Sequence, residues 1–282
     1  MSTPLLCSAA SLDADEIARE LKIPPCPAIL AQFTAEAKKD DPDPQLLAAL
    51  IGKDAGLAGA IIKAVNSPVY GLARKAADIP QALAILGLRA AANLITALLL
   101  RQAFPASSGA LMQRFWDEST RIAETAGTVA RHVRGVGREE ALTYGLFRNC
   151  GIAVMIAKFP YYGGIADAHS RTPGPDLAIA EEAKYRFNHA RVGYALARGW
   201  NLPDALCRSI QHHHDFARVA SGTRDTQGAS AALIAAGLLA EQVAALRAGG
   251  SVTPEWETHE AAVLKILAID ADAIVAMVAG YD

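Results

Sequence analysis

The stretch HARVGYALARGWNLPDALCRSIQHHH, residues 189–214, decides the fold because it indicates two helices with almost nothing between them. The helices are expected at 189–200 and 203–214, and the two-residue link Asn-Leu forces them into an antiparallel pair. Each helix is roughly 18 Å long at about 1.5 Å per residue. The start of the first helix therefore returns to the end of the second, and we expect His189 to lie beside the three histidines that end the stretch.

The run of three histidines turns this helix pair into a candidate ligand site. Consecutive residues on a helix splay by about 100° each, so at most two of the three imidazoles can point inward. We expect His213 and His214 to face His189, and His212 to be more exposed. Imidazole is the commonest protein metal ligand. A hydrolytic metal site also needs carboxylates, and Asp215 is the only acid in the run.

The rest of the chain is expected to be helical as well. Alanine and leucine dominate the 282 residues, whereas β-branched and aromatic residues are sparse. Proline and glycine mark most helix ends, as Gly87 does for a helix that starts near Pro80. We predict an all-α protein of many short helices in two lobes. The N-terminal lobe spans 1–105 and the C-terminal lobe 111–282, separated by the polar segment PASSGA (105–110).

Charge and hydropathy exclude several classes of partner. The net charge is −2 and no block of Lys and Arg stands out, so no nucleic-acid partner is expected. The four cysteines are scattered without a C-x-x-C pair, which is typical of idle thiols in a reducing compartment. No secretory signal is recognisable, and the strongest apolar run, 90–100, is too short to span a bilayer. We expect a cytoplasmic protein without a membrane partner.

Several short blocks lie between roughly residues 20 and 215. They are IPPCPAIL (23–30), IGKDAGLAGAIIKAVNSPVYG (51–71), IPQALAILGL (79–88), FWDEST (115–120), YGLFRNCG (144–151), EEAKYRFNHARVGYALARGWNLP (181–203) and SIQHHHD (209–215). In this order they resemble the HDOD family, the HD-related output domain of bacterial signalling proteins and a divergent branch of the HD phosphohydrolase superfamily. The resemblance implies a multi-helix, HD-like architecture.

Departures from the superfamily pattern indicate that its metal centre is degenerate. Catalytic members bind metal through a first His, a His-Asp doublet, further histidines and a late Asp. Here Glu118 stands where the first His is expected, Arg148 and Asn149 replace the doublet, and 234–240 contains no late Asp. Arg148 is a permanent cation with no lone pair for a metal. We expect Glu118 to pair with Arg148 instead.

The resemblance and the missing ligands together imply a non-catalytic signalling or regulatory module. The candidate ligand pocket comprises Glu118, Arg148, Asn149, His189, His213 and His214, with no metal and no cofactor expected. A protein partner in a signalling pathway is expected in trans, and a small anion or a nucleotide at Arg148 is a further possibility. Asp54, Asn66 and Ser67 are candidate partner contacts.

The alternative function is an enzyme. It is a metal-dependent phosphohydrolase or phosphodiesterase of HD type with an altered site, in which His189, His213 and His214 hold a metal with help from Glu118 and Asp215.

Overall fold

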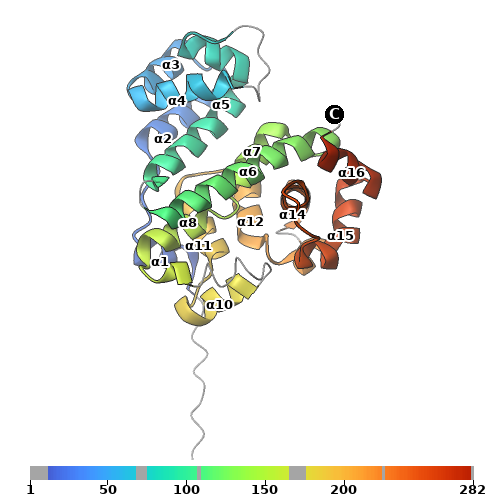
Figure 1. The fold of residues 1–282 in the computed structure, drawn as a ribbon. Coiled ribbons are helices and arrows are strands. Elements are labelled where there is room, and N and C mark those ends of the chain that lie inside the picture. Colours follow the sequence, from blue (N-terminus) through green and yellow to red (C-terminus); the bar gives the residue numbers. More distant parts are fainter. Residues whose placement is uncertain (1–11, 68–74, 107–108, 165–175, 224–225, 281–282) are drawn as a thin grey trace, which may run out of the picture.

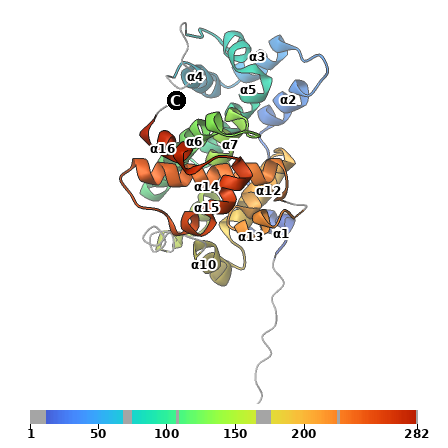
Figure 2. The ribbon, with the colours of Figure 1, turned by 90° about the vertical axis from the view of Figure 1, so that its right-hand side faces the viewer.

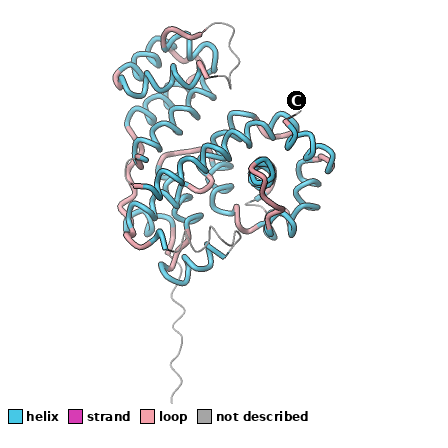
Figure 3. The backbone as a smooth tube through the Cα atoms, in the orientation of Figure 1, coloured by secondary structure: helices cyan, strands magenta, loops and turns pink. Residues whose placement is uncertain are grey.

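The structure is a computed structural model that describes residues 12–67, 75–106, 109–164, 176–223 and 226–280. Within these ranges the ordered elements are helices and no strand occurs, which confirms the all-α prediction (Figure 3). Most of the segment 105–110 between the lobes is described, but Ser107 and Ser108 lie outside the described residues. Residues 68–71, the end of the block 51–71, also lie outside the described residues.

The N-terminal lobe is built from four helices that lie together in Figure 1: α2 (Ala28–Ala37), α3 (Pro44–Gly52), α4 (Ala55–Val65) and α5 (Ile79–Ala103). Side chains of aspartates start three of them. Asp43, Asp54 and Asp78 each accept a hydrogen bond from a backbone N–H in the first turn of α3, α4 and α5. The apolar faces of these helices share one core.

The α5 helix is bent at the residue where the sequence predicts a stop. Gly87 has φ 72° and ψ 162°, outside the helical region, so the 25-residue element is two helical pieces joined by a kink. A positive φ costs glycine little because it lacks a Cβ. The second piece carries the chain from the N-terminal lobe down to the C-terminal lobe (Figure 1).

The C-terminal lobe surrounds one apolar helix, α14 (Ala229–Arg247). Figure 1 shows α14 end-on inside a ring of neighbours, and Figure 2 shows it from the side. Its buried residues lie on several faces, as expected for a helix packed all round. The other helices of this lobe are α6 (Ala110–His132), α7 (Arg138–Phe147), α8 (Cys150–Lys158), α10 (Asp176–Tyr185), α11 (His189–Gly199), α12 (Asp204–His212), α13 (Phe216–Ala220), α15 (Pro254–Leu267) and α16 (Ala271–Ala279).

One helix from the start of the chain belongs with the C-terminal lobe in space. The first helix, α1 (Ala14–Glu20), packs against α11. Nearby, the indole Nε1 of Trp200 donates a hydrogen bond of 3.0 Å to the carbonyl oxygen of Pro24. The two lobes are therefore joined by the segment before α2 as well as by α5. The predicted boundaries at 105 and 111 stay a prediction.

Two described helices are long and apolar enough to cross a membrane, judged by length and composition alone. They are α5 and α14, and the bent pair α3–α4 passes the same test as one segment. The expectation from the run 90–100 was too narrow, because α5 extends that run in the N-terminal direction. In this structure α14 is enclosed by its neighbours, and two thirds of its most apolar window is buried, 67%. The absence of a membrane partner stays a prediction.

Candidate functional site

The helix pair α11–α12 brings three imidazoles together as the sequence predicts. The Nε2 atom of His189 lies 3.3 Å from Nε2 of His213 and 3.0 Å from Nε2 of His214. Asn201 closes the link between the helices with a positive φ of 55°, a conformation that asparagine tolerates. Gly151 lets the first helix approach, because a Cβ there would lie 1.9 Å from the carbonyl oxygen of His189.

The exposure of the three consecutive histidines differs from the expectation. His212 is buried, with 9% of its surface exposed, whereas the side chain of His214 is the more open one at 19%. The helix ends at His212, two residues before the predicted end at 214. His213 sits at the C-cap, where its Nδ1 lies 2.7 Å from the carbonyl oxygen of Ile210.

A buried glutamate that the sequence reasoning did not single out orients His189. One carboxylate oxygen of Glu181, Oε2, lies 2.7 Å from Nδ1 of His189 and accepts its backbone N–H at 2.8 Å. Tyr162 donates its hydroxyl to the other oxygen. Burial opposes the ionisation of Glu181, but His189 and these hydrogen bonds outweigh it and lower its pKa. Glu181 therefore stays a carboxylate and fixes the ring of His189.

Burial favours the neutral form of the other two imidazoles. It is the largest cause that lowers the pKa of His213, and the charges of His214 and Arg148 act in the same direction. Burial also lowers the pKa of His214, although Glu255 opposes it. The carboxylate of Glu255 lies 3.7 Å from Nδ1 of His214. A proton therefore binds these two rings less readily than it binds an exposed histidine.

The predicted ion pair between Glu118 and Arg148 is wrong. Glu118 pairs with Arg121 on the same helix, at 2.6 Å between Oε1 and Nη2, and both side chains are exposed. Arg148 lies at the C-cap of α7 with only 1% exposure. Its Nη1 is 3.0 Å from Oε2 of Glu241 on α14. Which neighbour the side chain of Glu118 would meet could not be predicted from the sequence, and in the structure that neighbour is Arg121.

Glu241 is the second acid that the sequence reasoning missed. It directly follows the segment 234–240, where the resemblance places the late aspartate. Burial raises its pKa to about 7, although Arg148 attracts the charged form. Gly237, one turn earlier, permits this approach, since a Cβ there would lie 2.5 Å from Cε1 of Tyr144. The sequence feature that could have identified Glu241 is its place one position after the segment 234–240.

Several buried polar atoms around Arg148 have no hydrogen-bond partner among the described residues: Tyr144 Oη, Arg148 Nε and Nη1, Asn149 Oδ1 and His214 Nδ1. The contact of Nη1 with Glu241 is thus an ion pair without hydrogen-bond alignment. Asn149 is the N-cap residue of α8, yet its side chain makes no capping bond. The pocket therefore contains buried hydrogen-bond donors and acceptors beside the imidazoles that a ligand could bind.

The three candidate partner contacts lie in the N-terminal lobe. Asp54 caps α4 by accepting the N–H of Leu57 at 2.9 Å. Asn66 binds both backbone groups of Ala76, at 2.9 and 2.8 Å. These two polar side chains hold local structure. Ser67 instead lines a cavity between the lobes.

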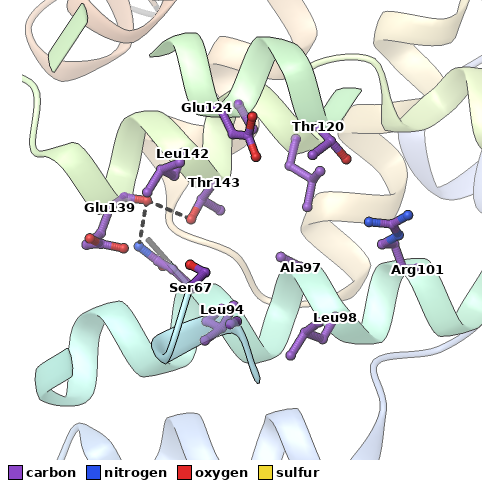
Figure 4. Close-up of a pocket in the computed structure, with 14 residues that line it drawn as sticks. Ser67, Leu94, Ala97, Leu98, Arg101, Thr120, Glu124, Glu139, Leu142 and Thr143 are labelled. Atoms are coloured by element: carbon purple, nitrogen blue, oxygen red, sulfur yellow. Dashed lines mark hydrogen bonds between the residues drawn. The ribbon is translucent and has the colours of Figure 1, made fainter. Parts of the chain in front are cut away.

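That interlobe cavity has a volume of about 260 Å³. In Figure 4 side chains of α5 face side chains of α6 and α7 across it, with Leu94, Ala97 and Leu98 on one wall and Leu142 on the other. Arg101, Glu124 and Glu139 add charge of both signs.

A two-metal hydrolytic centre does not fit the residues present, whereas a single ion does. In such centres two ions lie about 3.5–4 Å apart and need anionic ligands. Arg148 and Asn149 supply no anion at the doublet, and the acids near the histidines contact the Nδ1 side of the rings. Within the described residues, His189, His213 and His214 form the one group whose ligand atoms converge closely enough to hold a metal ion.

Comparison with known proteins places this architecture in a family. The HDOD domain model matches residues 23–216. A solved structure from Marinobacter aquaeolei VT8, described as a suggested signal transduction protein, is 18% identical with a TM-score of 0.71. The similarity covers 94% of this chain and 58% of that one. A suggested phosphohydrolase from Shewanella amazonensis SB2B is 19% identical with a TM-score of 0.69, covering 94% and 92%. At these identities the likeness shows the fold alone.

A relative from Treponema pallidum, an uncharacterized protein, is 27% identical over 188 residues. The match covers 63% of this chain and 35% of the relative, so it spans about a third of that longer protein. The family model covers well over half of this chain, and the helical fold agrees with it. The chain belongs to the HDOD family.

Proposed function

We propose that this protein is a non-catalytic signalling module that acts by binding a protein partner. The observation that carries the proposal is the buried Arg148, which stands at the position of the metal-binding doublet of catalytic relatives and forms an ion pair with the partly exposed Glu241. A guanidinium cannot ligate a metal, and its charge repels one from that position. His189 and His213 are each only 1% exposed, so within the cluster a phosphate ester could reach only the partly exposed side chain of His214.

The interlobe cavity supports an amphipathic helix of a partner as the occupant. Leu94, Ala97, Leu98 and Arg101 recur at i, i+3, i+4 and i+7 on α5, which gives a continuous helical stripe along one wall. An amphipathic helix binds by laying its apolar face against an apolar wall of this kind. The volume of about 260 Å³ is below the roughly 300–1,000 Å³ of small-ligand sites. It suits a few side chains of a partner better than a whole nucleotide.

The cavity also offers a way to transmit a signal. Its walls come from both lobes, so any change in their relative packing changes its shape and thereby its affinity for a partner. A small anion at Arg148 is the second candidate, favoured by the unpartnered donors Arg148 Nε and Tyr144 Oη. The carboxylates of Glu241 and Glu255 beside them oppose an anion.

Filling the cavity tests the docking proposal. Ala97→Trp places an indole in the cavity, whereas Val275→Trp places one on α16, where Val275 is 67% exposed. Wild type and each variant are immobilised as bait for a pull-down from a lysate of the native cells. Circular dichroism checks that the variants are folded. We expect wild type and Val275→Trp to capture the same protein, and Ala97→Trp to lose it. Equal capture by both variants contradicts docking at this cavity, and a thermal shift with phosphate that vanishes in Arg148→Ala favours the anion.

A further inference from the structure

We propose that His189, His213 and His214 together bind one zinc ion through their Nε2 atoms. For zinc–nitrogen bonds of about 2.0–2.1 Å, two ligand atoms lie roughly 3.0 Å apart at a right angle and roughly 3.3 Å apart at the tetrahedral angle. The observed Nε2–Nε2 distances are 3.0 and 3.3 Å. These two distances are those that a single ion requires, and the ligand atoms of all three residues lie within 4.8 Å of one another.

The outer ring nitrogens fix the direction of the lone pairs. A carboxylate accepts hydrogen bonds but donates none, so Nδ1 of His189 carries the proton that Glu181 accepts at 2.7 Å. Nδ1 of His213 likewise donates to the carbonyl oxygen of Ile210 at 2.7 Å. In the neutral rings both Nε2 atoms are then lone-pair acceptors that face each other at 3.3 Å. Two acceptors cannot form a hydrogen bond with each other, whereas a cation between them would coordinate both lone pairs.

A hydrogen bond from His214 alone does not satisfy both of these acceptors. Its Nε2 could carry a proton and donate it to His189 at 3.0 Å, but His213 would still face an occupied acceptor. With the proton on Nδ1, the Nε2 of His214 becomes a third converging lone pair. Its Nδ1 is buried without a hydrogen-bond partner among the described residues, at 3.7 Å from Glu255. A small closing movement of Glu255 would let the carboxylate accept that proton and fix the ring for a metal.

The charges around the cluster favour a divalent cation over an anion. Glu181 contacts His189, Glu255 lies by His214, and Glu241 pairs with Arg148. These three carboxylates outnumber the one guanidinium and leave an excess of one to two negative charges, depending on the protonation of Glu241. One divalent ion neutralises this excess. Three imidazoles without a carboxylate in direct contact are typical of zinc rather than magnesium or calcium.

The zinc ion would act as a structural clamp. It would tie the first residue of α11 to the chain just after α12, while α10 and α15 supply the acids behind the rings. This inference replaces the sequence-based expectation of a metal-free pocket. It is independent of the proposed function, because a zinc clamp neither requires nor excludes a docked partner.

Metal analysis of untagged protein tests the proposal. The protein is stripped with a chelator, loaded with zinc, passed through gel filtration and analysed by mass spectrometry for metals. We expect wild type to keep one zinc per chain and His213→Ala to keep none. His132→Ala is the matched control because His132, on α6, lies outside the cluster, and it should keep one. Cobalt(II) should show the ligand-field bands of a nitrogen-ligated site in wild type and in His132→Ala, but not in His213→Ala.

Folding of the variants is checked by circular dichroism. If His213→Ala does not fold, His214→Ala takes its place, because that side chain is partly exposed and its removal disturbs the core less. Zinc should raise the melting temperature of wild type but not of the cluster variant, and magnesium should raise neither. Wild type that retains no zinc overturns the proposal. Equal zinc content in wild type and the cluster variant also overturns it.

Discussion

Glu181 is the residue that holds the histidine cluster in order. It has no exposed surface, and its two oxygens take hydrogen bonds from His189 and Tyr162. Charge-assisted hydrogen bonds are stronger than neutral ones, so a neutral amide in the same place is a poor substitute. The ring direction of His189, and with it the geometry of the whole cluster, depends on this carboxylate.

Replacing this acid should therefore cost far more stability than replacing its neighbour. Glu181→Gln should lower the free energy of unfolding by about 1.5–3 kcal/mol, the range for hydrogen bonds to charged groups. Glu182→Gln is the matched control. It breaks a partly exposed pair with Arg191, 2.9 Å between Oε1 and Nη1, and should cost less than about 1 kcal/mol. Urea unfolding at pH 7 measures both, and equal losses would contradict the role given to Glu181.

The sign of the pH dependence follows from the lowered pKa of Glu181. Because the folded-state pKa lies below the unfolded value, the carboxylate stabilises the fold fully above the unfolded pKa. That stabilisation is lost as the pH falls through the folded pKa. The difference between wild type and Glu181→Gln should thus shrink on acidification, and a difference that grows would contradict the assignment.

Some side-chain contacts could be predicted from the sequence, and others could not. The meeting of His189, His213 and His214 follows from a two-residue link, and it could be predicted. The partner of Arg148 could not, because it depends on how α14 rotates against α7, a contact between distant parts of the chain. His212 was misjudged because the end of a helix cannot be located to one residue from its sequence.

Helix α14 shows how one element positions the pocket. Its buried residues lie on several faces, and Gly237 brings it close to Tyr144 and Arg148 on α7. The helix itself could be predicted from the apolar sequence of 226–248. Its role as the central helix of the lobe could not, since an apolar helix carries no mark of which neighbours enclose it. The cap at Asp43 and a break at Gly87 could be predicted from local chemistry, whereas Asp54 was expected to contact a partner and instead caps α4.

A pair of glycine substitutions tests the close approach of α14. Gly237→Ala gains helix propensity but forces a Cβ to 2.5 Å from Cε1 of Tyr144, and overpacking costs about 1–3 kcal/mol. We expect a net loss of stability. Gly59→Ala on α4 has no atom within 4 Å of the new Cβ and should gain up to about 1 kcal/mol. Thermal unfolding of both proteins compares the signs, and a gain for Gly237→Ala would contradict the packing.

The complete fold is two lobes that share α5 and the segment before α2. The buried Trp200 at the end of α11, 2% exposed, binds that segment through a hydrogen bond to Pro24. The first helix of the chain packs against α11, in the C-terminal lobe, although the helices that follow it in sequence belong to the N-terminal lobe. This arrangement leaves the interlobe cavity between α5 and α6–α7, while the histidine cluster lies inside the C-terminal lobe. Docking and metal binding thus use separate places in the molecule.

The central claim is that the histidine cluster does not hydrolyse phosphate esters, and turnover measures it most directly. Untagged wild type and the double variant His189→Ala/His213→Ala are each incubated with a chromogenic phosphomonoester and a phosphodiester, in zinc, manganese or magnesium. We expect the two proteins to give the same background rate with every metal. Metal-dependent hydrolysis by wild type that disappears in the double variant would contradict the account.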